Sequence, residues 1–275
     1  MSSFSIGEVV RRTGVAEGTL RMWESRHGFP APERLPNGHR RYSERDIALV
    51  RQVGSQRAAG VSLAVAIERA MRDLEPPGPS LYAALRRRHP ELEPRTLPKR
   101  LMLALSHAIE EESLSRADRP LLFAAFQRER FYRQEQARWR ELARTAELTL
   151  AFADFEQLRT PRGGPAEIPI APDDPFAREW AIVCDAPGHA VCLAGWEPSS
   201  STAAAESERF FEAVWSVDPE VVREAARLCA AIAAARQPEL VSPIRARLDA
   251  PPALPTRDQL RLATAITNRT LSYLA

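Results

Sequence analysis

Five arginines between residues 21 and 41 have the chemistry to contact a nucleic-acid backbone. A guanidinium group stays charged and donates hydrogen bonds in one plane, which matches both a phosphate and a guanine edge. Residues 1–75 carry a formal charge of +3, from 12 arginines and 9 acidic residues, whereas the rest of the chain carries −1. A solvated charged surface is the alternative reading. The charge coincides with a predicted turn and loop, however, which favours a surface that binds DNA.

Residues 5–42 are predicted to form the elements that position these arginines. Ser5 followed by Glu8 is a capping box, which begins a helix at the next residue. Gly14 then allows a sharp turn between this helix and the next. A second helix from about residue 17 to residue 26 completes a helix-turn-helix.

The second helix is predicted to have a buried face and an outer face. Leu20 and Trp23 lie at helical spacing on the buried face, so we interpret Trp23 as a core residue rather than a DNA contact. Thr19 and Arg21 lie on the outer face. Because the nearby residues are small and read few base edges, recognition is expected to depend partly on DNA shape.

A small wing is predicted to follow the second helix. Pro30 and Pro32 prevent the helix from continuing. Asn37-Gly38 then favours a tight turn between two extended arms. Ser43 with Asp46 caps a third helix, and a fourth helix after it closes the core of this domain.

The motifs SIGE, TGV, TLRMWE and NGHRRYS resemble the winged helix-turn-helix of the MerR family of transcription regulators over about 70 residues. TLRMWESRHGFP is similar in particular to the branch found in cobalamin-dependent light-sensing regulators. The resemblance implies that the second helix enters the major groove and that the wing lies beside it. It also implies Arg21 as a phosphate clamp and Arg40 and Tyr42 as wing contacts.

The predicted DNA contacts combine the residues on these elements. Phosphate contacts position such a module, whereas only a few contacts to base edges specify sequence. The primary candidates are Thr19, Arg21, Arg40 and Tyr42, and the secondary candidates are Arg12, Arg26, Arg34, Asn37, His39 and Arg41.

The composition is that of a globular protein with room for more than one domain. The chain has 275 residues, of which 44% are hydrophobic and 27% charged. No apolar run approaches the roughly 18–20 residues that span a bilayer, and no signal peptide is recognisable, so we expect no membrane partner and a cytoplasmic location.

The rest of the chain predicts an α+β domain after a linker. Short apolar runs at 120–127 and 148–155, a hairpin turning at Pro187-Gly188 and a strand near 210 are flanked by helices, which indicates a small, mostly antiparallel sheet. The predicted boundaries are a mainly α winged helix-turn-helix domain at 1–75, a linker with a short helix at 76–95, the α+β domain at 96–240, and a C-terminal extension ending in a helix at 241–275.

The second half also resembles a known family, the DICT domain, over about residues 95–235. The similar segments are LPKRLMLALSHAIEEE, the run from LLFAAFQ to LAFADF, and EWAIVCDAPGHAVCLAGWE followed by FFEAVWSV. DICT is a sensory module found beside signalling outputs. The resemblance implies sensing without naming a ligand or its binding residues.

The hairpin holds a group that could bind metal or sense redox state. A loop centred on Gly188 would place Cys184 opposite Cys192, close to His189, whereas a slip of one residue would send the two thiols to opposite faces. Three ligands without a fourth make a poor zinc site. We therefore interpret the two cysteines as buried apolar residues and predict no metal and no cofactor.

Aromatic residues of the second half are candidates for a ligand pocket, although an ordinary core uses the same residue types. They are Phe152, Phe155, Trp180, Trp196 and Trp215. Four acidic residues could fix a ligand or carry a perturbed pKa, namely Glu110, Asp154, Asp185 and Glu197.

The sequence contains none of the motifs GxSxG, HExxH, GxGxxG or the P-loop, so we predict that the protein is not an enzyme. No histidine loop typical of cobalamin binding surrounds His189. The expected function is a homodimeric transcription regulator that binds an inverted-repeat operator in duplex DNA and senses an unidentified small molecule, with RNA polymerase as a further candidate partner. The alternative is a C-terminal half that serves as a dimerisation and protein-interaction scaffold without a ligand.

Overall fold

The computed structural model describes residues 4–35, 38–72, 80–198 and 209–275. Two compact units are present, the first from residues 1–75 and 198–210 and the second from residues 76–197 and 211–275. The predicted PPGPS linker at 76–80 and the tip of the wing at Asn37 lie largely outside the described residues.

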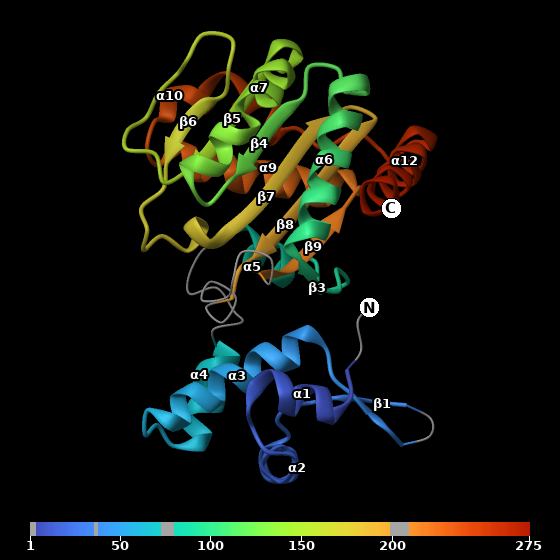
Figure 1. Ribbon diagram of the computed structural model, residues 1–275. Helices are drawn as coiled ribbons and strands as arrows, with labels where there is room; N and C mark the ends of the chain where they lie inside the picture. The colour runs from blue at the N-terminus through green and yellow to red at the C-terminus, as the bar shows by residue number, and fades with distance from the viewer. Residues whose placement is uncertain (1–3, 36–37, 73–79, 199–208) are drawn as a thin grey trace. The chain divides into compact units, whose positions relative to one another are not determined.

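The first unit has the predicted helices and the two strands of the wing (Figure 1). Its helices are α1 (Ile6–Thr13), α2 (Glu17–His27), α3 (Glu44–Ala58) and α4 (Leu63–Arg72). Its strands, β1 (Glu33–Arg34) and β2 (Arg40–Arg41), pair antiparallel.

Local sequence explains where these helices begin and end. The side chain of Ser5 accepts a hydrogen bond from the backbone N–H of Glu8 and so caps α1. Gly14 ends α1 with a φ of 72°, a left-handed conformation that glycine adopts without steric cost. Ser43 and Asp46 form a complete capping box at the start of α3.

The core of the first unit contains the residues predicted to face inward. Leu20 and Trp23 of α2 are buried, and the Trp23 ring packs against Phe29 with centroids 6.1 Å apart. Val50 and Val53 of α3 belong to the same apolar core. The interpretation of Trp23 as a core residue is therefore confirmed.

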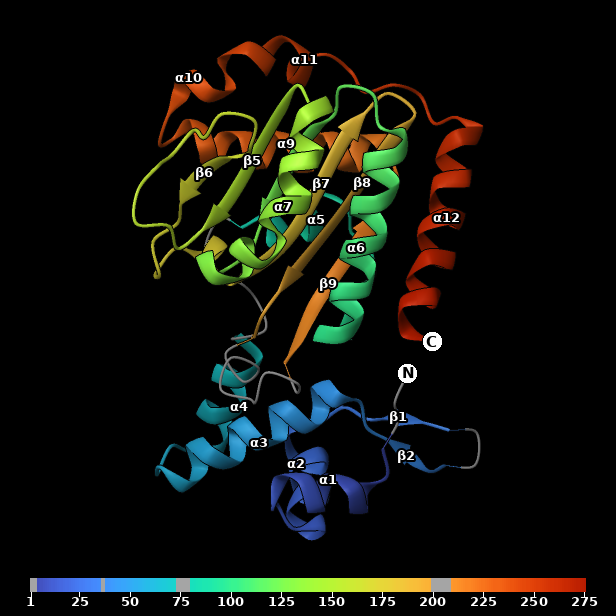
Figure 2. The ribbon, with the colours of Figure 1, turned by 45° about the horizontal axis from the view of Figure 1, so that its top comes forward.

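The second unit is a seven-stranded mixed sheet with helices on both faces (Figures 1 and 2). Its strands are β3 (Arg95–Pro98), β4 (Leu121–Ala125), β5 (Leu148–Ala153), β6 (Ala166–Pro169), β7 (Glu179–Ala186), β8 (His189–Trp196) and β9 (Phe210–Ser216). Their order in the sheet is β3-β9-β8-β7-β4-β5-β6. The pairs β4–β5 and β5–β6 are parallel, whereas the pairs β4–β7, β7–β8 and β8–β9 are antiparallel.

Each face of this sheet has its own apolar core. One face packs on α5 (Leu81–Arg88), α9 (Pro219–Ala234), α10 (Pro238–Val241) and α11 (Arg245–Asp249). The other face packs on α6 (Lys99–Arg116), α7 (Glu129–Thr145) and α12 (Arg257–Leu274). Short 3-10 turns at Pro175–Arg178 and Ser242–Ile244 connect some of these elements.

Several features of the second unit differ from the sequence-based expectation. Strand β3 was not predicted, because its four residues include a proline and show no alternation. The short helix assigned to the linker is α5, which buries Leu81, Tyr82 and Leu85 in the core. The C-terminal helix packs on α6 and buries Leu262 and Ile266 in the other core. No helix in the described residues is long and apolar enough to cross a membrane.

Candidate nucleic-acid interface and sensory cavity

The outer face of α2 presents Arg21 to solvent, as predicted. Its Nη2 atom lies 2.6 Å from Glu17 Oε1, one helical turn earlier. Both side chains are largely exposed, and an exposed pair at this spacing contributes only about 0.3–0.5 kcal/mol. A phosphate can therefore replace Glu17 as the partner of Arg21 at little cost. Thr19, on the same helix, is half-buried.

Glu24 joins the second helix to both strands of the wing. Its two carboxylate oxygens accept hydrogen bonds from Arg34 Nη2 on β1 and Arg40 Nε on β2, each at 2.7 Å. Burial opposes the charged form of Glu24, but the hydrogen bonds and charges of the two arginines outweigh it and hold its pKa below the usual value. The wing is thus held against α2 by a charge-assisted contact on each strand.

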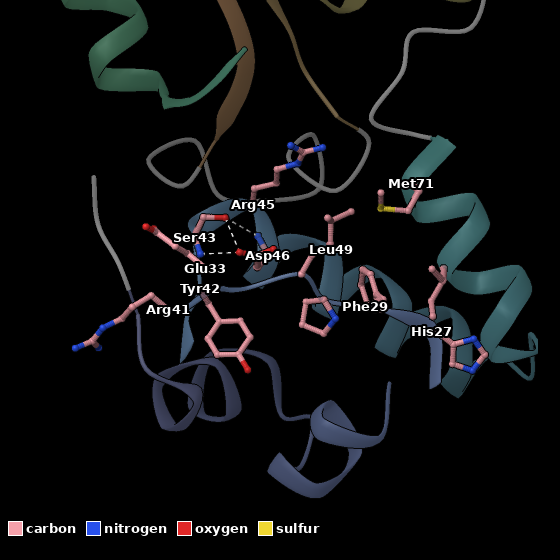
Figure 3. Close-up of a pocket in the computed structure, with 14 residues that line it drawn as sticks. His27, Phe29, Glu33, Arg41, Tyr42, Ser43, Arg45, Asp46, Leu49 and Met71 are labelled. Carbon is pink, nitrogen blue, oxygen red and sulfur yellow. Dashed lines mark hydrogen bonds between the residues drawn. The ribbon is translucent and has the colours of Figure 1, made fainter. Parts of the chain in front are cut away.

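Tyr42 requires a correction. Its side chain is only 1% exposed and belongs to the core of the first unit, so it supports the wing from within rather than offering a surface for DNA. The backbone of Tyr42 pairs with that of Phe4 in an isolated antiparallel bridge. Figure 3 shows that Tyr42 and its neighbour Arg41 point in different directions. The tyrosine followed two arginines at the wing, a pattern that does not reveal which side chain turns inward.

The remaining candidates are divided between structural and surface positions. Arg12 is half-buried, forms an ion pair with Glu44 at 2.9 Å and lies over the Phe4 ring, so it ties α1 to α3. Arg26 and His39 are exposed, and Arg41 is half-buried. Asn37 lies outside the described residues.

A hollow of about 470 Å³ lies between the base of the wing and helices α3 and α4 (Figure 3). Phe29, Leu49 and Met71 form its apolar part, and Arg41 and Arg45 contribute charge. The capping box of Ser43 and Asp46 forms part of its wall. This box fixes the point at which the chain leaves the wing and enters α3.

In the second unit, a smaller cavity of about 110 Å³ lies where α6 and α7 meet the sheet. Phe126, Phe131 and Trp180 supply its aromatic walls. The Trp180 indole is fixed because its Nε1 donates a hydrogen bond to Ser106 Oγ at 3.0 Å. The cavity combines apolar walls with a few polar groups, as small-molecule sites do.

The polar groups of this cavity are His107, Glu110 and Glu135. Burial raises the pKa of Glu110 to about 7, although Arg138 and Trp139 oppose the shift. The carboxylate of Glu135 raises the pKa of His107, and the imidazole in turn lowers that of Glu135. Perturbed titratable groups at a cavity are typical of functional sites.

The five aromatic pocket candidates do not converge. Phe152 and Trp196 are buried in one core of the sheet, and Phe155 is buried in the other. Trp180 lines the cavity beside Glu110. Trp215 is 39% exposed and lines a separate groove between β9 and α12.

Three of the four acidic candidates lie away from the cavity, and each has a structural partner. Asp154 accepts the backbone N–H of Glu129 at the first residue of α7. Asp185 forms a buried ion pair with Arg223, with Oδ2 2.5 Å from Nε. Glu197 accepts a hydrogen bond from Gln127. Glu110 alone of the four borders the cavity.

The hairpin register separates the two cysteines that were considered as metal ligands. Cys184 pairs with Val191 and Cys192 with Val183, which is the register slipped by one residue. Cys184 therefore lies in one core and Cys192 in the other. Burial raises the pKa of each thiol to about 12. Because the two thiols lie on opposite faces of the sheet, they do not form one ligand set with His189.

Sequence reasoning missed His107 and Glu135. His107 and Glu110 are three residues apart, which places them on one face of α6. Glu135 comes from α7, and only the packing of the two helices brings it near. The HAIE segment was a usable signal, but it looked like the polar edge of an amphipathic helix.

The fold and surfaces define a winged helix-turn-helix head followed in the chain by a sheet domain that contains a cavity of about 110 Å³. Comparison with known proteins gives both parts a family. Residues 4–73 match the model of the MerR HTH family regulatory proteins. Residues 79–198 match DICT, described as a sensory domain in diguanylate cyclases and two-component systems. The two matched regions are thus a MerR-type helix-turn-helix followed by a DICT sensory domain, as the sequence motifs predicted.

Curated relatives agree with the assignment of the head. The chain is 42% identical over 74 residues to the HTH-type transcriptional repressor CarA of Myxococcus xanthus, covering 26% of this chain and 25% of CarA. It is 33% identical over 64 residues to CarH of the same organism, covering 23% of this chain and 21% of CarH. It is 36% identical over 53 residues to the HTH-type transcriptional regulator MlrA of Salmonella typhimurium, covering 19% of this chain and 22% of MlrA. The chain therefore spans a quarter or less of each of these relatives.

Proposed function

We propose that this protein is a transcription regulator that binds an inverted-repeat operator as a homodimer and responds to a small molecule through its DICT domain. The observation that carries the DNA-binding part is the double contact of Glu24 with Arg34 and Arg40. It holds the wing in a fixed position beside the helix that presents Arg21.

The proposed interface uses the groove and the backbone together. Arg21 contacts a phosphate or a guanine edge from α2, and Thr19 lies beside it. Arg34 and Arg40 flank the groove from the wing, with Arg26, His39, Asn37 and Arg41 as additional contacts. Arg12 serves the interface indirectly, because its ion pair with Glu44 holds α1 on α3.

The proposed dimer is inferred from the geometry of an inverted repeat. Half-sites one helical turn apart lie about 34 Å from each other along the DNA. One helix-turn-helix reads one half-site, so an inverted repeat requires two copies of the chain.

Support for the sensory part comes from the cavity between α6 and α7. It has aromatic walls and polar groups with perturbed pKa values, and it lies within the residues that match the DICT model. A ligand with unequal affinity for two arrangements of the dimer would change how the two heads fit DNA. RNA polymerase as a partner and a cytoplasmic location remain predictions from the sequence.

Selection of genomic DNA fragments by the purified full chain tests the DNA-binding proposal. We expect enrichment of fragments that share an inverted repeat, and the genes beside them would indicate the signal. A parallel selection with Arg21→Ala, which removes an exposed guanidinium, should lose the enriched motif. Recovery of random fragments by the unaltered chain would refute the proposal.

The scaffold alternative also has an observation in its favour. A groove of about 530 Å³ between β3, β9, α6 and α12 is lined by apolar residues that include Leu101, Trp215 and Leu271. Leu271 and Trp215 are exposed, as residues at protein interfaces are before assembly. Native mass spectrometry of freshly purified protein distinguishes the two functions. A retained small molecule favours sensing. A ligand-free dimer whose mass does not change after incubation with metabolite extracts favours the scaffold.

A further inference from the structure

Three metal-ligating side chains converge at the cavity between α6 and α7. They are His107 and Glu110 on α6 and Glu135 on α7, and their ligand atoms all lie within 4.8 Å of one another. His107 Nε2 is 3.6 Å from Glu135 Oε1. An imidazole and two carboxylates from two helices form a common donor set for first-row divalent metals.

Glu110 is buried, and only one of its two oxygens accepts a hydrogen bond within the described part of the chain. Its side chain is only 3% exposed. One oxygen, Oε1, accepts a hydrogen bond from the Trp139 indole at 2.9 Å. The other oxygen, Oε2, is buried without a hydrogen-bond partner among the described residues, and so is His107 Nε2. A buried carboxylate oxygen left without a donor costs free energy, so it points to a missing partner.

Arg138 is the cation that compensates these carboxylates in the structure. Its Nη1 lies 3.4 Å from Glu110 Oε2, and its Nε lies 3.8 Å from Glu135 Oε2. Both distances are long for a charge-assisted hydrogen bond, which is about 2.7–2.9 Å. The Arg138 side chain is 32% exposed, so its guanidinium can move into solvent when another cation enters.

We propose that His107, Glu110 and Glu135 bind a divalent transition-metal ion, and that Arg138 competes with it for the two carboxylates. The 110 Å³ cavity beside these ligands leaves room for a water molecule or a small anion as a further ligand. The role of the ion as a signal rests on the proposed sensory function. Binding of the ion does not, because it can be measured without DNA.

Binding requires a modest rearrangement of the three side chains. Nitrogen and oxygen ligands lie about 2.0–2.2 Å from a zinc ion, so the ligand atoms must approach one another more closely than they do now. Glu135 is 30% exposed and His107 25%, so both side chains are less confined than that of Glu110, which is 3% exposed. Glu110 can remain in place, because the Trp139 hydrogen bond uses its other oxygen.

Titration of the full chain with Co²⁺, followed by competition with Zn²⁺, tests the site. Visible absorption of bound Co²⁺ reports the coordinating atoms, and Zn²⁺ should abolish it. We expect His107→Gln and Glu135→Gln each to weaken binding by about tenfold or more. His89→Gln and Glu141→Gln are matched controls, because they alter a histidine and a glutamate of the same unit outside the cluster, and they should bind as the unaltered chain does.

Arg138→Gln distinguishes a metal site from a structural ion network. Removal of the competing guanidinium should tighten Co²⁺ binding severalfold if the metal takes its place. Equal affinity in Arg138→Gln and the unaltered chain, or equal affinity in His107→Gln and its control, would overturn the inference. Circular dichroism confirms that each variant is folded, and Glu110→Gln offers a further test because it retains an acceptor for Trp139.

Operator binding is measured on the same preparations with and without Zn²⁺. Failure of the unaltered chain to bind Co²⁺, together with intact operator binding, would refute the metal site but not the proposed regulator. Metal binding by an unaltered chain that selects no operator would refute the proposed regulator but not the metal site.

Discussion

Glu24 Oε2 accepts a hydrogen bond from Arg40 Nε at 2.7 Å, and this contact joins the second helix of the head to the second strand of the wing. The other oxygen of Glu24 holds Arg34 on the first strand in the same way. A single carboxylate therefore holds both strands of the wing to α2. It also reduces the positive charge that the wing presents.

Substitution Glu24→Gln should reduce discrimination between operator and random DNA. Loss of the negative charge leaves Arg34 and Arg40 more available to any phosphate, so affinity for random DNA should rise. The wing also loses its fixed position, so the advantage of the operator should shrink about fivefold or more. Fluorescence anisotropy on the two DNAs gives the ratio, and a ratio equal to that of the unaltered chain would contradict the clamp.

Substitution Glu17→Gln should have a different effect on the same two DNAs. Glu17 contacts Arg21 but no wing residue in the described part of the chain. Its neutralisation frees Arg21 and removes a negative charge near the duplex, so both affinities should rise about twofold at low salt. Weaker binding to both DNAs would show that the pair with Glu17 positions Arg21 productively.

The three cysteines should be unreactive in the folded protein. Cys184, Cys192 and Cys229 are buried, and burial raises the pKa of each thiol above its usual value. Because the thiolate is the reactive species, a chromogenic disulfide reagent should label them slowly without denaturant and completely in urea. Rapid labelling of the native chain would contradict the burial of the thiols and reopen redox sensing.

His189 should destabilise the second unit as the pH falls. Desolvation lowers its pKa to about 4, although Glu112 opposes the shift, and its Nε2 lies 3.2 Å from Ser113 Oγ. The unfolded chain binds this proton near pH 6.5, so the stability that the neutral ring contributes is complete above about pH 6.5 and is lost as pH falls toward 4.

Urea unfolding at several pH values measures this effect through tryptophan fluorescence. Relative to His189→Gln, the unaltered chain should lose about 2–3 kcal/mol between pH 6.5 and pH 4. His27→Gln, in the exposed part of the head, serves as the control and should leave the pH dependence unchanged. Parallel pH profiles for the unaltered chain and His189→Gln would refute the assignment.

The head was predictable from sequence because its signals are local. A serine cap, a left-handed glycine and a capping box at Ser43 each act within four residues, and each begins or ends the helix where expected. What could not be read was the direction of Tyr42, since wing strands of two residues are too short to show alternation. The ion pairs of Arg12 with Glu44 and of Arg40 with Glu24 could not be predicted either, because each joins residues distant in sequence.

In the second unit, the longer helices and strands were predictable, but their assembly was not. The hairpin shows the limit, because a shift of one residue in its turn decides whether Cys184 faces Cys192 or the opposite core. Strand β3 is stabilised by the sheet rather than by its own sequence. The cavity depends on two helices meeting, so His107 and Glu135 carried no joint signal.

The most direct test of the DNA-binding head is the affinity of Arg21→Ala for the selected operator at several salt concentrations. The account predicts binding weakened by about tenfold and a salt dependence shallower by about one counterion, because one phosphate contact is lost. Arg144→Ala, which removes another exposed arginine, on α7, should match the unaltered chain. If folded Arg21→Ala binds the operator with unchanged affinity and unchanged salt dependence, α2 is not the element that contacts DNA.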